Sequence, residues 1–319
     1  MRITVILPTY NERVNIKKLI PILEEEIFPK IKNHNMHILV VDDNSPDGTA
    51  EEVKEFTKKW ENIAILLAEK QGLGAAYVRG MRYAMDKMEA EVVIEFDADF
   101  QHDPHDIPRL IEAMDNGADY VIGSRYVLGG GIPKEWKIHR KIISRFGGLF
   151  AQIVLWTWNI HDMTSGYKLT KTSLLRNIDL DHLYSKYYAY KLHILHDVLL
   201  QKPKVVEVPI IFYERKEGSS KITQKDLLDS FWVVIRLRIR DSKRLIKFLV
   251  VGGTGFIVQV VTQESSIHLG ITAFITNILI NHGLVTDLTS VSHSIGAGFG
   301  AEAAIISNFL FNNFCMGFV

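Results

Sequence analysis

The stretch Val92-Val93-Ile94-Glu95-Phe96-Asp97-Ala98-Asp99-Phe100-Gln101-His102 decides the fold that the rest of the chain is expected to adopt. It opens as an apolar run typical of a buried β-strand and ends in two carboxylates separated by a single residue. Strand side chains alternate between faces, so Asp97 and Asp99 point the same way if the strand continues that far. Such a pair suits Mg²⁺ or Mn²⁺, although an acidic loop after a strand has the same pattern.

The composition describes a soluble region followed by an apolar end. The chain has 319 residues, of which 37 are basic and 37 acidic, so no net charge favours nucleic acid as a partner. The one cysteine, Cys315, excludes an intrachain disulfide and fits a reducing compartment. Charged side chains become rare from Ile246 onward.

Apolar runs alternate with segments of helical spacing through the first half of the chain. Strands are expected at 2–7, 37–41, 63–67, 92–96, 120–123 and 205–212, and helices at 15–27, 50–60 and from Gly74 to 88. This alternation predicts an α/β fold with a mostly parallel sheet and helices on both faces. Ligands of such sheets bind beyond the carboxyl ends of the strands, where Asp97 and Asp99 would stand. Their position therefore favours a metal site over an acidic loop.

Further polar groups at strand ends fit a nucleotide. Glu12 and either Asp42 or Asp43 could accept hydrogen bonds from a base or a ribose. Gly72 and Gly74 would let the backbone approach a ligand closely, unless they only form a turn. Neither a G-x-G-x-x-G after the first strand nor a G-x-x-x-x-G-K-[ST] occurs, which argues against a dinucleotide enzyme and a P-loop NTPase.

The second half of the soluble region supplies cations. Arg125 follows the strand at 120–123, and Arg140 and Ser144 come after a glycine loop. Arg215 and Lys221 flank a polar loop after the last strand. Arg and Lys beside small residues suit phosphate oxygens, although any one of them could instead form a surface ion pair.

These motifs, taken in order, resemble family 2 glycosyltransferases over residues 1–222, and within them the dolichol (polyprenol) phosphate mannose synthase branch. The resemblance is carried by Pro8-Thr9-Tyr10-Asn11-Glu12, Asp42-Asp43-Asn44-Ser45-Pro46-Asp47-Gly48-Thr49, Gly72-Leu73-Gly74, Asp97-Ala98-Asp99, Gly123-Ser124-Arg125-Tyr126, Arg140-Lys141-Ile142-Ile143-Ser144-Arg145 and Arg215-x-x-Gly218-x-Ser220-Lys221.

The resemblance implies a GT-A fold and mannose transfer from GDP-mannose to dolichyl or polyprenyl phosphate. Asp97, Asp99 and Gln101 would hold Mn²⁺ or Mg²⁺. Residues implied at the donor are Pro8, Tyr10, Glu12, Asp42, Asp43, Gly72, Gly74, Ala98 and the metal ligands. Residues implied at the phosphates and in catalysis are Asp99, Arg125, Arg140, Ser144, Arg215 and Lys221. Family members often carry a Glu after Thr164-Ser165-Gly166, where this chain offers Lys191 as another phosphate contact.

The implied chemistry needs no general base, because the acceptor phosphate is already anionic. In-line attack on an α-linked donor would invert the anomeric carbon and give dolichyl β-D-mannosyl phosphate. Two alternatives stay open: UDP-glucose as donor for a dolichyl-phosphate glucosyltransferase, and a membrane-anchored binding protein with an inactive GT-A domain.

The end of the chain suits a lipid acceptor. Residues 223–245 form a basic amphipathic stretch suited to a membrane surface, although packing on the soluble domain would also explain it. Two apolar stretches follow, 246–262 and 295–318, each near the ~20 residues of a membrane-spanning helix. Residues 271–280 are too short to cross and are expected in the interface.

The tail, residues 246–319, resembles the GtrA-like membrane domain, which usually has four helices, whereas about two are expected here. We therefore expect a truncated or shorter version of that domain. Gly296 and Gly300 give a G-x-x-x-G helix contact, and Glu302 should face protein. The basic stretch before the first span predicts an integral membrane protein with a cytoplasmic catalytic domain.

Overall fold

A computed structural model describes residues 1–215, 223–282, 284 and 288–310 of the chain. The contacts divide the chain into two compact units, Met1–Arg238 and Ile239–Val319, and each is described by itself. Lys221, one of the predicted phosphate ligands, lies outside the described residues.

The first unit is built on a 7-stranded sheet in the order β3-β2-β1-β4-β6-β5-β7. Its strands are β1 (Arg2–Thr9), β2 (Asn35–Asp42), β3 (Ile63–Leu67), β4 (Val92–Glu95), β5 (Tyr120–Ser124), β6 (Lys168–Lys171) and β7 (Val205–Pro209). β6 runs antiparallel to both of its neighbours, β4 and β5, while the other pairings are parallel. The predicted mostly parallel α/β sheet is confirmed, and β6 is the strand that the sequence pattern did not indicate.

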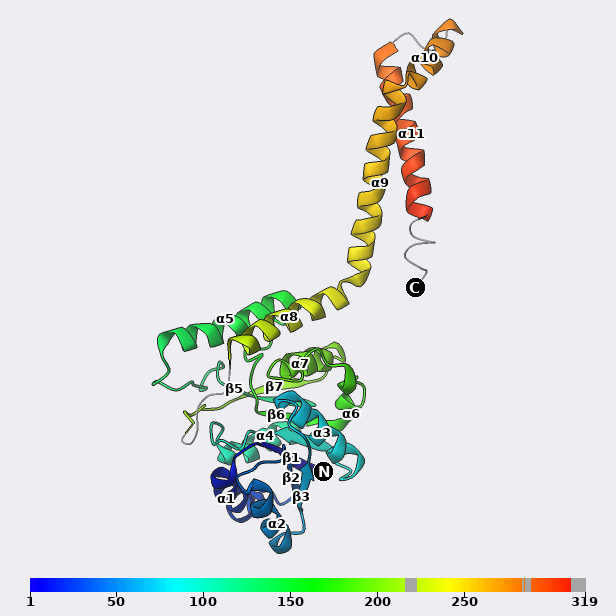
Figure 1. Ribbon diagram of the computed structural model, residues 1–319. Coiled ribbons are helices and arrows are strands. Elements are labelled where there is room, and N and C mark those ends of the chain that lie inside the picture. The colour runs from blue at the N-terminus through cyan, green and yellow to red at the C-terminus, as the bar shows by residue number, and fades with distance from the viewer. Residues whose placement is uncertain (216–222, 283, 285–287, 311–319) are drawn as a thin grey trace. The chain divides into compact units, whose positions relative to one another are not determined.

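Helices cover both faces of this sheet (Figure 1). They are α1 (Arg13–Pro21), α2 (Thr49–Lys59), α3 (Leu73–Asp86), α4 (Ile107–Asp115), α5 (Ile138–Leu155), α6 (Thr172–Leu175), α7 (Tyr190–Leu200) and α8 (Gln224–Asp241). A π-helical turn spans Ile22–Ile27, and 3₁₀ turns span Phe28–Lys30, Pro104–Asp106 and Leu180–His182.

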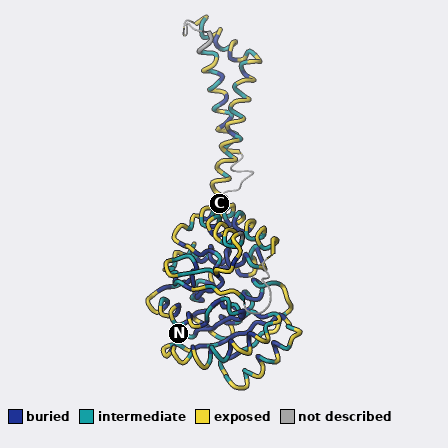
Figure 2. Tube along the Cα trace, turned by 90° about the vertical axis from the view of Figure 1, so that its left-hand side faces the viewer, coloured by how far each residue is buried: buried dark blue, intermediate teal, exposed yellow. Residues whose placement is uncertain are grey.

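Strand alternation sorts the apolar side chains into two cores. Ile3, Val5 and Leu7 of β1 pack with residues of α1, α2 and α4 on one face. Ile6 packs with α3, α5, α7 and α8 on the other. Figure 2 shows the buried residues concentrated in the interior of the first unit. The rigid sheet between two cores holds the loops at its carboxyl edge in place.

Three of those loops have a non-glycine residue in the left-handed region. Asn11 follows β1 with φ 58°, Asn44 follows β2 with φ 51°, and Phe100 follows β4 with φ 58°. Such values are uncommon outside glycine and cluster where the surrounding structure fixes a loop for function. β1 is hydrogen-bonded to both β2 and β4, so the three loops are neighbours.

Two predicted elements differ from the structure in their extent. The helix expected at 15–27 is α-helical only to Pro21 and continues as the π-helical turn. Proline has no backbone N–H to bond to the preceding turn, so the regular hydrogen-bond pattern is interrupted at this point. The last strand ends at Pro209, opposite the last residue of β5, and beyond it a bridge pairs Ile211 with Gly131.

The second unit contains α9 (Lys243–His268), α10 (Ile271–Asn281) and α11 (Leu288–Leu310). α9 and α11 lie side by side (Figures 1 and 2). A Cβ on Gly300 would lie 2.6 Å from the backbone oxygen of Gln259, and one on Gly296 3.3 Å from the Oγ of Ser266. The predicted helix contact through these two glycines is present.

Within the described part of the chain, length and composition identify α9 as one candidate membrane span, with a mean hydropathy of 1.8. The predicted span at 295–318 overlaps α11, which does not qualify on the same criteria, and its end lies outside the described residues. The segment at 271–280 forms the short apolar helix α10. The membrane-spanning domain and its GtrA-like character therefore stay predictions.

Candidate active site

The two carboxylates beyond β4 are presented by a tight turn rather than by the strand itself. β4 ends at Glu95, so the alternation of strand side chains does not extend to Asp97 and Asp99. The Oδ1 of Asp99 accepts a hydrogen bond from the backbone N–H of Gln101 at 3.0 Å, and Phe100 between them has φ 58°. Ala98, between the two carboxylates, is buried in the core and so anchors the turn to the first unit.

Asp97 lies among groups that shift its pKa in opposite directions. Its Oδ1 accepts a hydrogen bond from the hydroxyl of Tyr77 at 2.8 Å. Burial raises the pKa of Asp97 to about 6, the charge of Lys191 opposes that shift, and the charge of Asp99 adds to it. The like charge of Asp99 is unfavourable to ionised Asp97, and a positive charge beside the pair relieves that repulsion.

Arg215 already places a positive charge at Asp99. Its Nε donates to the Oδ2 of Asp99 at 3.0 Å, and its Nη2 donates to the same oxygen. Burial lowers the pKa of Arg215, but the charge and hydrogen bonds of Asp99, together with the charges of Glu12 and Asp97, outweigh it and raise that pKa. Residues from the loops after β1, β4 and β7 therefore lie close together at the carboxyl edge of the sheet.

The predicted metal ligands are two carboxylates and one amide. Among the described residues, no three His, Cys, Asp or Glu side chains gather as a metal-binding group. Asp97 and Asp99 supply two carboxylates, and Gln101 an amide whose Nε2 donates to the carbonyl of Tyr213 at 3.4 Å. Mg²⁺ and Mn²⁺ are commonly held by one or two carboxylates together with substrate phosphates. The donor set fits an ion that binds together with a diphosphate.

The loops after β1 and β2 supply the predicted nucleotide side. Asp42 is fixed by three donors: the hydroxyls of Thr9 and Ser45 at 2.8 and 2.6 Å, and the N–H of Ser45 at 2.8 Å. Asp43 forms an ion pair with Arg79, and burial raises its pKa although that arginine opposes the shift.

Tyr10 and Glu12 flank the same edge of the sheet. The Nζ of Lys70 lies 3.2 Å from the centroid of the Tyr10 ring, and Glu12 accepts a hydrogen bond from Asn15 at 2.6 Å. Pro8 is half-buried in β1, opposite Val41 of β2. A ring beside a cation and several fixed carboxylates suit a nucleoside.

Gly72 and Gly74 approach the protein's own chain closely. A Cβ on Gly72, which has φ 111°, would lie 2.6 Å from the carbonyl oxygen of Lys186, and one on Gly74 would lie 2.7 Å from the Cβ of Tyr190. These glycines therefore fix the segment that leads into α7. The next residue of that helix, Lys191, is buried, and its Nζ lies 4.3 Å from the centroid of the Tyr188 ring.

Gly166 connects Lys191 to the carboxylates. A Cβ added there would lie 3.1 Å from the Nζ of Lys191, 3.2 Å from the Oδ2 of Asp97 and 3.6 Å from the Nε2 of His102. The absence of a side chain at Gly166 thus lets an ammonium, a carboxylate and an imidazole converge.

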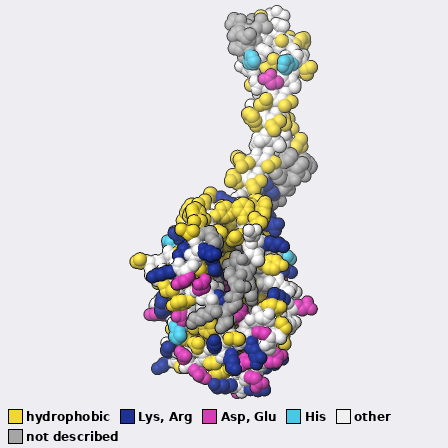
Figure 3. All heavy atoms as spheres, turned by 60° about the vertical axis from the view of Figure 1, so that its left-hand side comes forward, with side chains coloured by type: hydrophobic (Ala, Val, Ile, Leu, Met, Phe, Trp, Pro, Cys, Tyr) yellow, Lys and Arg dark blue, Asp and Glu magenta, His cyan; other side chains and the backbone are white. Residues whose placement is uncertain are grey.

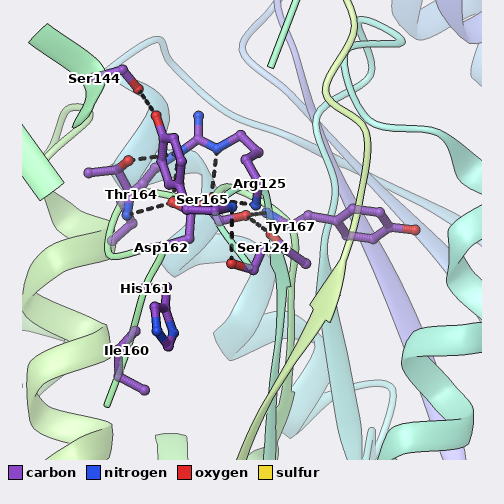
Figure 4. A network of polar contacts seen from close by, with 12 residues as sticks. Ser124, Arg125, Ser144, Ile160, His161, Asp162, Thr164, Ser165 and Tyr167 are labelled. Carbon is purple, nitrogen blue, oxygen red and sulfur yellow. Dashed lines mark hydrogen bonds and ion pairs between the residues drawn. The ribbon is translucent and has the colours of Figure 1, made fainter. Parts of the chain in front are cut away.

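The remaining predicted cations lie along the loop after β5 and on α5. Arg125 is buried and bonded to Asp162, as Figure 4 shows. Ser144 shares a 2.6 Å hydrogen bond with the hydroxyl of Tyr126. The guanidinium of Arg140 lies 4.0 Å from the centroid of the Trp136 ring. Arg140 and Ser144 stand one helical turn apart and so share a face of α5.

The structure thus brings Asp97, Asp99, Lys191 and Arg215 into one cluster, with Arg125 reached through the 162–166 segment. Sequence reasoning missed Asp162 and Tyr77, which fix predicted site residues by hydrogen bonds. Asp162 precedes Thr164-Ser165-Gly166 by two residues, and that proximity was the available signal.

An exposed apolar surface lies over α5 and α8, which we call the α5/α8 surface. Phe150 and Phe231 stack between the two helices, with ring centroids 5.1 Å apart. Exposed side chains of this surface are Ile138, Ile142, Phe146, Ile153, Trp156, Leu228 and Trp232. Figure 3 shows hydrophobic side chains gathered at one end of the first unit with Lys and Arg beside them. The guanidinium of Arg238 lies 3.8 Å from the centroid of the Trp156 ring.

The fold and the cluster are those of a GT-A-type, Rossmann-like transferase domain. Residues 4–179 match the model of the family described as "Glycosyl transferase family 2". The chain is 36% identical over 268 residues to dolichol-phosphate mannosyltransferase of Pyrococcus furiosus, which covers 81% of this chain and 70% of that protein. It is 36% identical over 241 residues to polyprenol monophosphomannose synthase of Mycolicibacterium smegmatis, and this match covers 75% of this chain and 88% of that protein. The chain belongs to glycosyltransferase family 2.

A solved structure supports the fold alone. Glucosyl-3-phosphoglycerate synthase from Mycobacterium tuberculosis, in complex with Mn²⁺, uridine diphosphate and phosphoglyceric acid, is similar with a TM-score of 0.54. The match covers 74% of this chain and 78% of that chain at 14% identity.

Proposed function

We propose that this protein transfers mannose from GDP-mannose to a dolichyl or polyprenyl phosphate, with inversion at the anomeric carbon. The observation that carries the proposal is the meeting of Asp97, Asp99 and Arg215 at the carboxyl edge of the sheet. Its support from relatives is that two proteins 36% identical to this chain are named for mannosyl transfer to dolichol phosphate and polyprenol.

On this proposal Asp97, Asp99 and Gln101 hold Mn²⁺ or Mg²⁺ together with the donor diphosphate. The bound ion supplies positive charge to the leaving diphosphate. Pro8, Tyr10, Glu12, Asp42, Asp43, Gly72 and Gly74 line or shape the nucleotide site, and Ala98 anchors the turn that presents the two carboxylates. Lys191 adds a buried ammonium beside Asp97.

The cationic side chains act on the two phosphorylated substrates. The acceptor phosphate is already ionised, so no side chain of the protein has to remove a proton from it. Arg140, Arg215 and Lys221 offset the repulsion between acceptor and donor, and Arg125 and Ser144 add hydrogen-bond donors. They also orient the attacking oxygen for an in-line approach.

The enzyme reaches its lipid acceptor at the surface of a membrane. The α5/α8 surface combines exposed aromatic and aliphatic side chains with basic ones, which suits the interface of a bilayer. We propose that the catalytic unit docks there from the cytoplasmic side and that α9 anchors the chain in the membrane. The candidate span and the basic residues before it support this arrangement.

The test is sugar transfer to a polyprenyl phosphate in detergent, with GDP-mannose and UDP-glucose supplied separately. GDP-mannose should be the better donor, and Asp97→Asn or Asp99→Asn should abolish transfer. Chelator should do the same to the unaltered protein, and Mn²⁺ or Mg²⁺ should restore it. Asp115→Asn, at a surface pair with His34, is the matched control. Full activity in chelator refutes the metal assignment, and transfer from UDP-glucose alone refutes the choice of donor.

A further inference from the structure

Arg125 and Asp162 form a buried ion pair with unusually complete geometry. The Nε and Nη2 of Arg125 each donate to a different oxygen of Asp162 at 2.7 Å, and the backbone N–H of Arg125 donates at 3.0 Å. The side chain of Asp162 is fully buried, and that of Arg125 is 6% exposed. Burial alone would raise the pKa of Asp162, but the charge and hydrogen bonds of Arg125 outweigh it and lower that pKa.

A second carboxylate fixes the position of Asp162. Glu207 of β7 accepts hydrogen bonds from the backbone N–H groups of His161 and Asp162 at 2.8 and 2.9 Å. The Nδ1 of His161 lies 2.7 Å from the same carboxylate. Glu207, on a strand of the sheet, therefore fixes the backbone at Asp162, and Asp162 in turn holds Arg125.

The ion pair uses two of the three guanidinium nitrogens of Arg125. Its Nη2 also donates to the hydroxyl of Thr164 at 2.8 Å, so Nε and Nη2 are both engaged. The Nη1 of Arg125 makes no hydrogen bond to any of the described residues, and in Figure 4 this end of the guanidinium points away from Asp162. The pair is neutral as a whole, so its contribution is a fixed donor rather than a net charge. A donor that is already ordered loses little conformational entropy when a ligand binds.

The segment that holds Arg125 also reaches the carboxylate cluster. Thr164 contacts Arg125, and two residues later Gly166 packs against Lys191 and Asp97. Arg125 is therefore tied by a short, buried piece of chain to the place where the donor diphosphate is proposed to bind.

We infer that Asp162 is a positioning residue that aims the Nη1 of Arg125 at the acceptor phosphate. The inference rests on the proposed function, because it takes the acceptor to be a phosphate monoester. Asp162 itself contacts neither substrate and acts only through Arg125.

The test compares Asp162→Asn, Arg125→Lys and the double variant. Asparagine keeps the size of the side chain but loses the charge and one acceptor oxygen. We expect Asp162→Asn to lower kcat/KM for the acceptor by about tenfold while KM for the donor changes less than about twofold. In the Arg125→Lys background the same substitution should have almost no further effect on the acceptor, because the group it aims is already gone.

Asp119→Asn is the matched control, since Asp119 pairs with Lys171 at 2.8 Å away from the cluster. It is expected to lower the thermal midpoint without changing KM for the acceptor. If Asp162→Asn fails to fold, Thr164→Val removes one bond to Arg125 and should give a smaller, acceptor-specific loss. Equal losses for donor and acceptor, or an undiminished effect in the Arg125→Lys background, overturn the inference. Absence of transfer to polyprenyl phosphate by the unaltered protein refutes the proposed function instead.

Discussion

Arg215 forms an ion pair with Asp99 and, on the proposed function, also binds a phosphate. In the structure it donates twice to Asp99 and lies in the field of Glu12. We expect Arg215→Ala to cut transfer by roughly ten- to a hundredfold, the value of about 1.5–3 kcal/mol for a charge-assisted bond, with little change in GDP affinity. Arg215→Lys should still be impaired because lysine lacks the two-pronged geometry. Lys221→Ala is expected to behave like Arg215→Ala.

The measurement is transfer at saturating donor and limiting acceptor. Arg176→Ala serves as the control because Arg176 pairs with Asp86 at 3.5 Å outside the cluster. Near-normal transfer by the two alanine variants would remove this loop from the active site. Tolerance of lysine at position 215 would reduce the role of Arg215 to an ion pair.

Glu24 makes the stability of the first unit depend on pH. Burial raises its pKa from 4.5 to about 7, although a hydrogen bond from Asn62 opposes the shift. Between these values the folded state binds the proton more tightly than the unfolded chain does. The free energy of unfolding therefore falls as the pH rises through this window. Glu24→Gln should flatten the profile and raise the denaturant midpoint at about pH 8 relative to the unaltered protein. Parallel profiles for the two proteins would contradict this assignment.

At the residue scale, the sequence predicts the groups that we propose to contact ligands better than it predicts the groups that hold those side chains in position. Asp97, Asp99 and Arg215 could be chosen because each follows a predicted strand. Asp162 could not, because its role depends on the fork that it makes with Arg125, a residue of another loop. Lys191 is buried on a helix, and only the packing of Gly74 and Gly166 against its surroundings places it near Asp97.

At the element scale, the repeating strands and helices of the first half could be predicted because their apolar spacing is regular. Helix α5 could not be predicted in this way, because its exposed face carries Ile142, Phe146 and Ile153 and the sequence therefore shows no clear polar side. Strand β6 was not predicted either, because a lysine in the sequence does not indicate a central strand, although Lys168 is fully buried in it. Burial lowers the pKa of that lysine to about 8.

The α5/α8 surface leads to a prediction about the lipid part of the acceptor. α8 buries Val233, Val234 and Leu237 against the first unit, which leaves Leu228 and Trp232 exposed on its other side. A charge placed there would be costly at a bilayer interface. We expect Leu228→Glu and Trp232→Glu to lower transfer to a long-chain acceptor in lipid roughly tenfold, with little change for a short, water-soluble polyprenyl phosphate.

Leu200→Glu is the control for the α5/α8 surface. Leu200 is 56% exposed at the end of α7, so a charge there tests exposure without membrane docking. Equal losses with the long and the short acceptor would indicate damage to the catalytic cluster. No loss with either acceptor would show that this surface does not meet the membrane.

At the scale of the whole molecule, the two compact units predict that catalysis and anchoring can be separated. The predicted donor-site residues and the described cations all precede Arg238, while the candidate span α9 begins at Lys243. A chain ending at Ser242 keeps α8 complete and should fold and bind GDP within about twofold of the full chain. Its transfer to a long-chain acceptor in liposomes should fall further than that, because α9 no longer concentrates the enzyme at the lipid.

The readouts for this truncation are GDP affinity by calorimetry and transfer with long and short acceptors. Membrane concentration acts on encounter with the lipid, so the short, water-soluble acceptor should be used almost normally by the shortened chain. If GDP affinity falls in proportion to long-chain transfer, the second unit supports the fold of the first and the two functions are not separable. If long-chain transfer is unchanged, the α5/α8 surface alone suffices for docking, and α9 has another role.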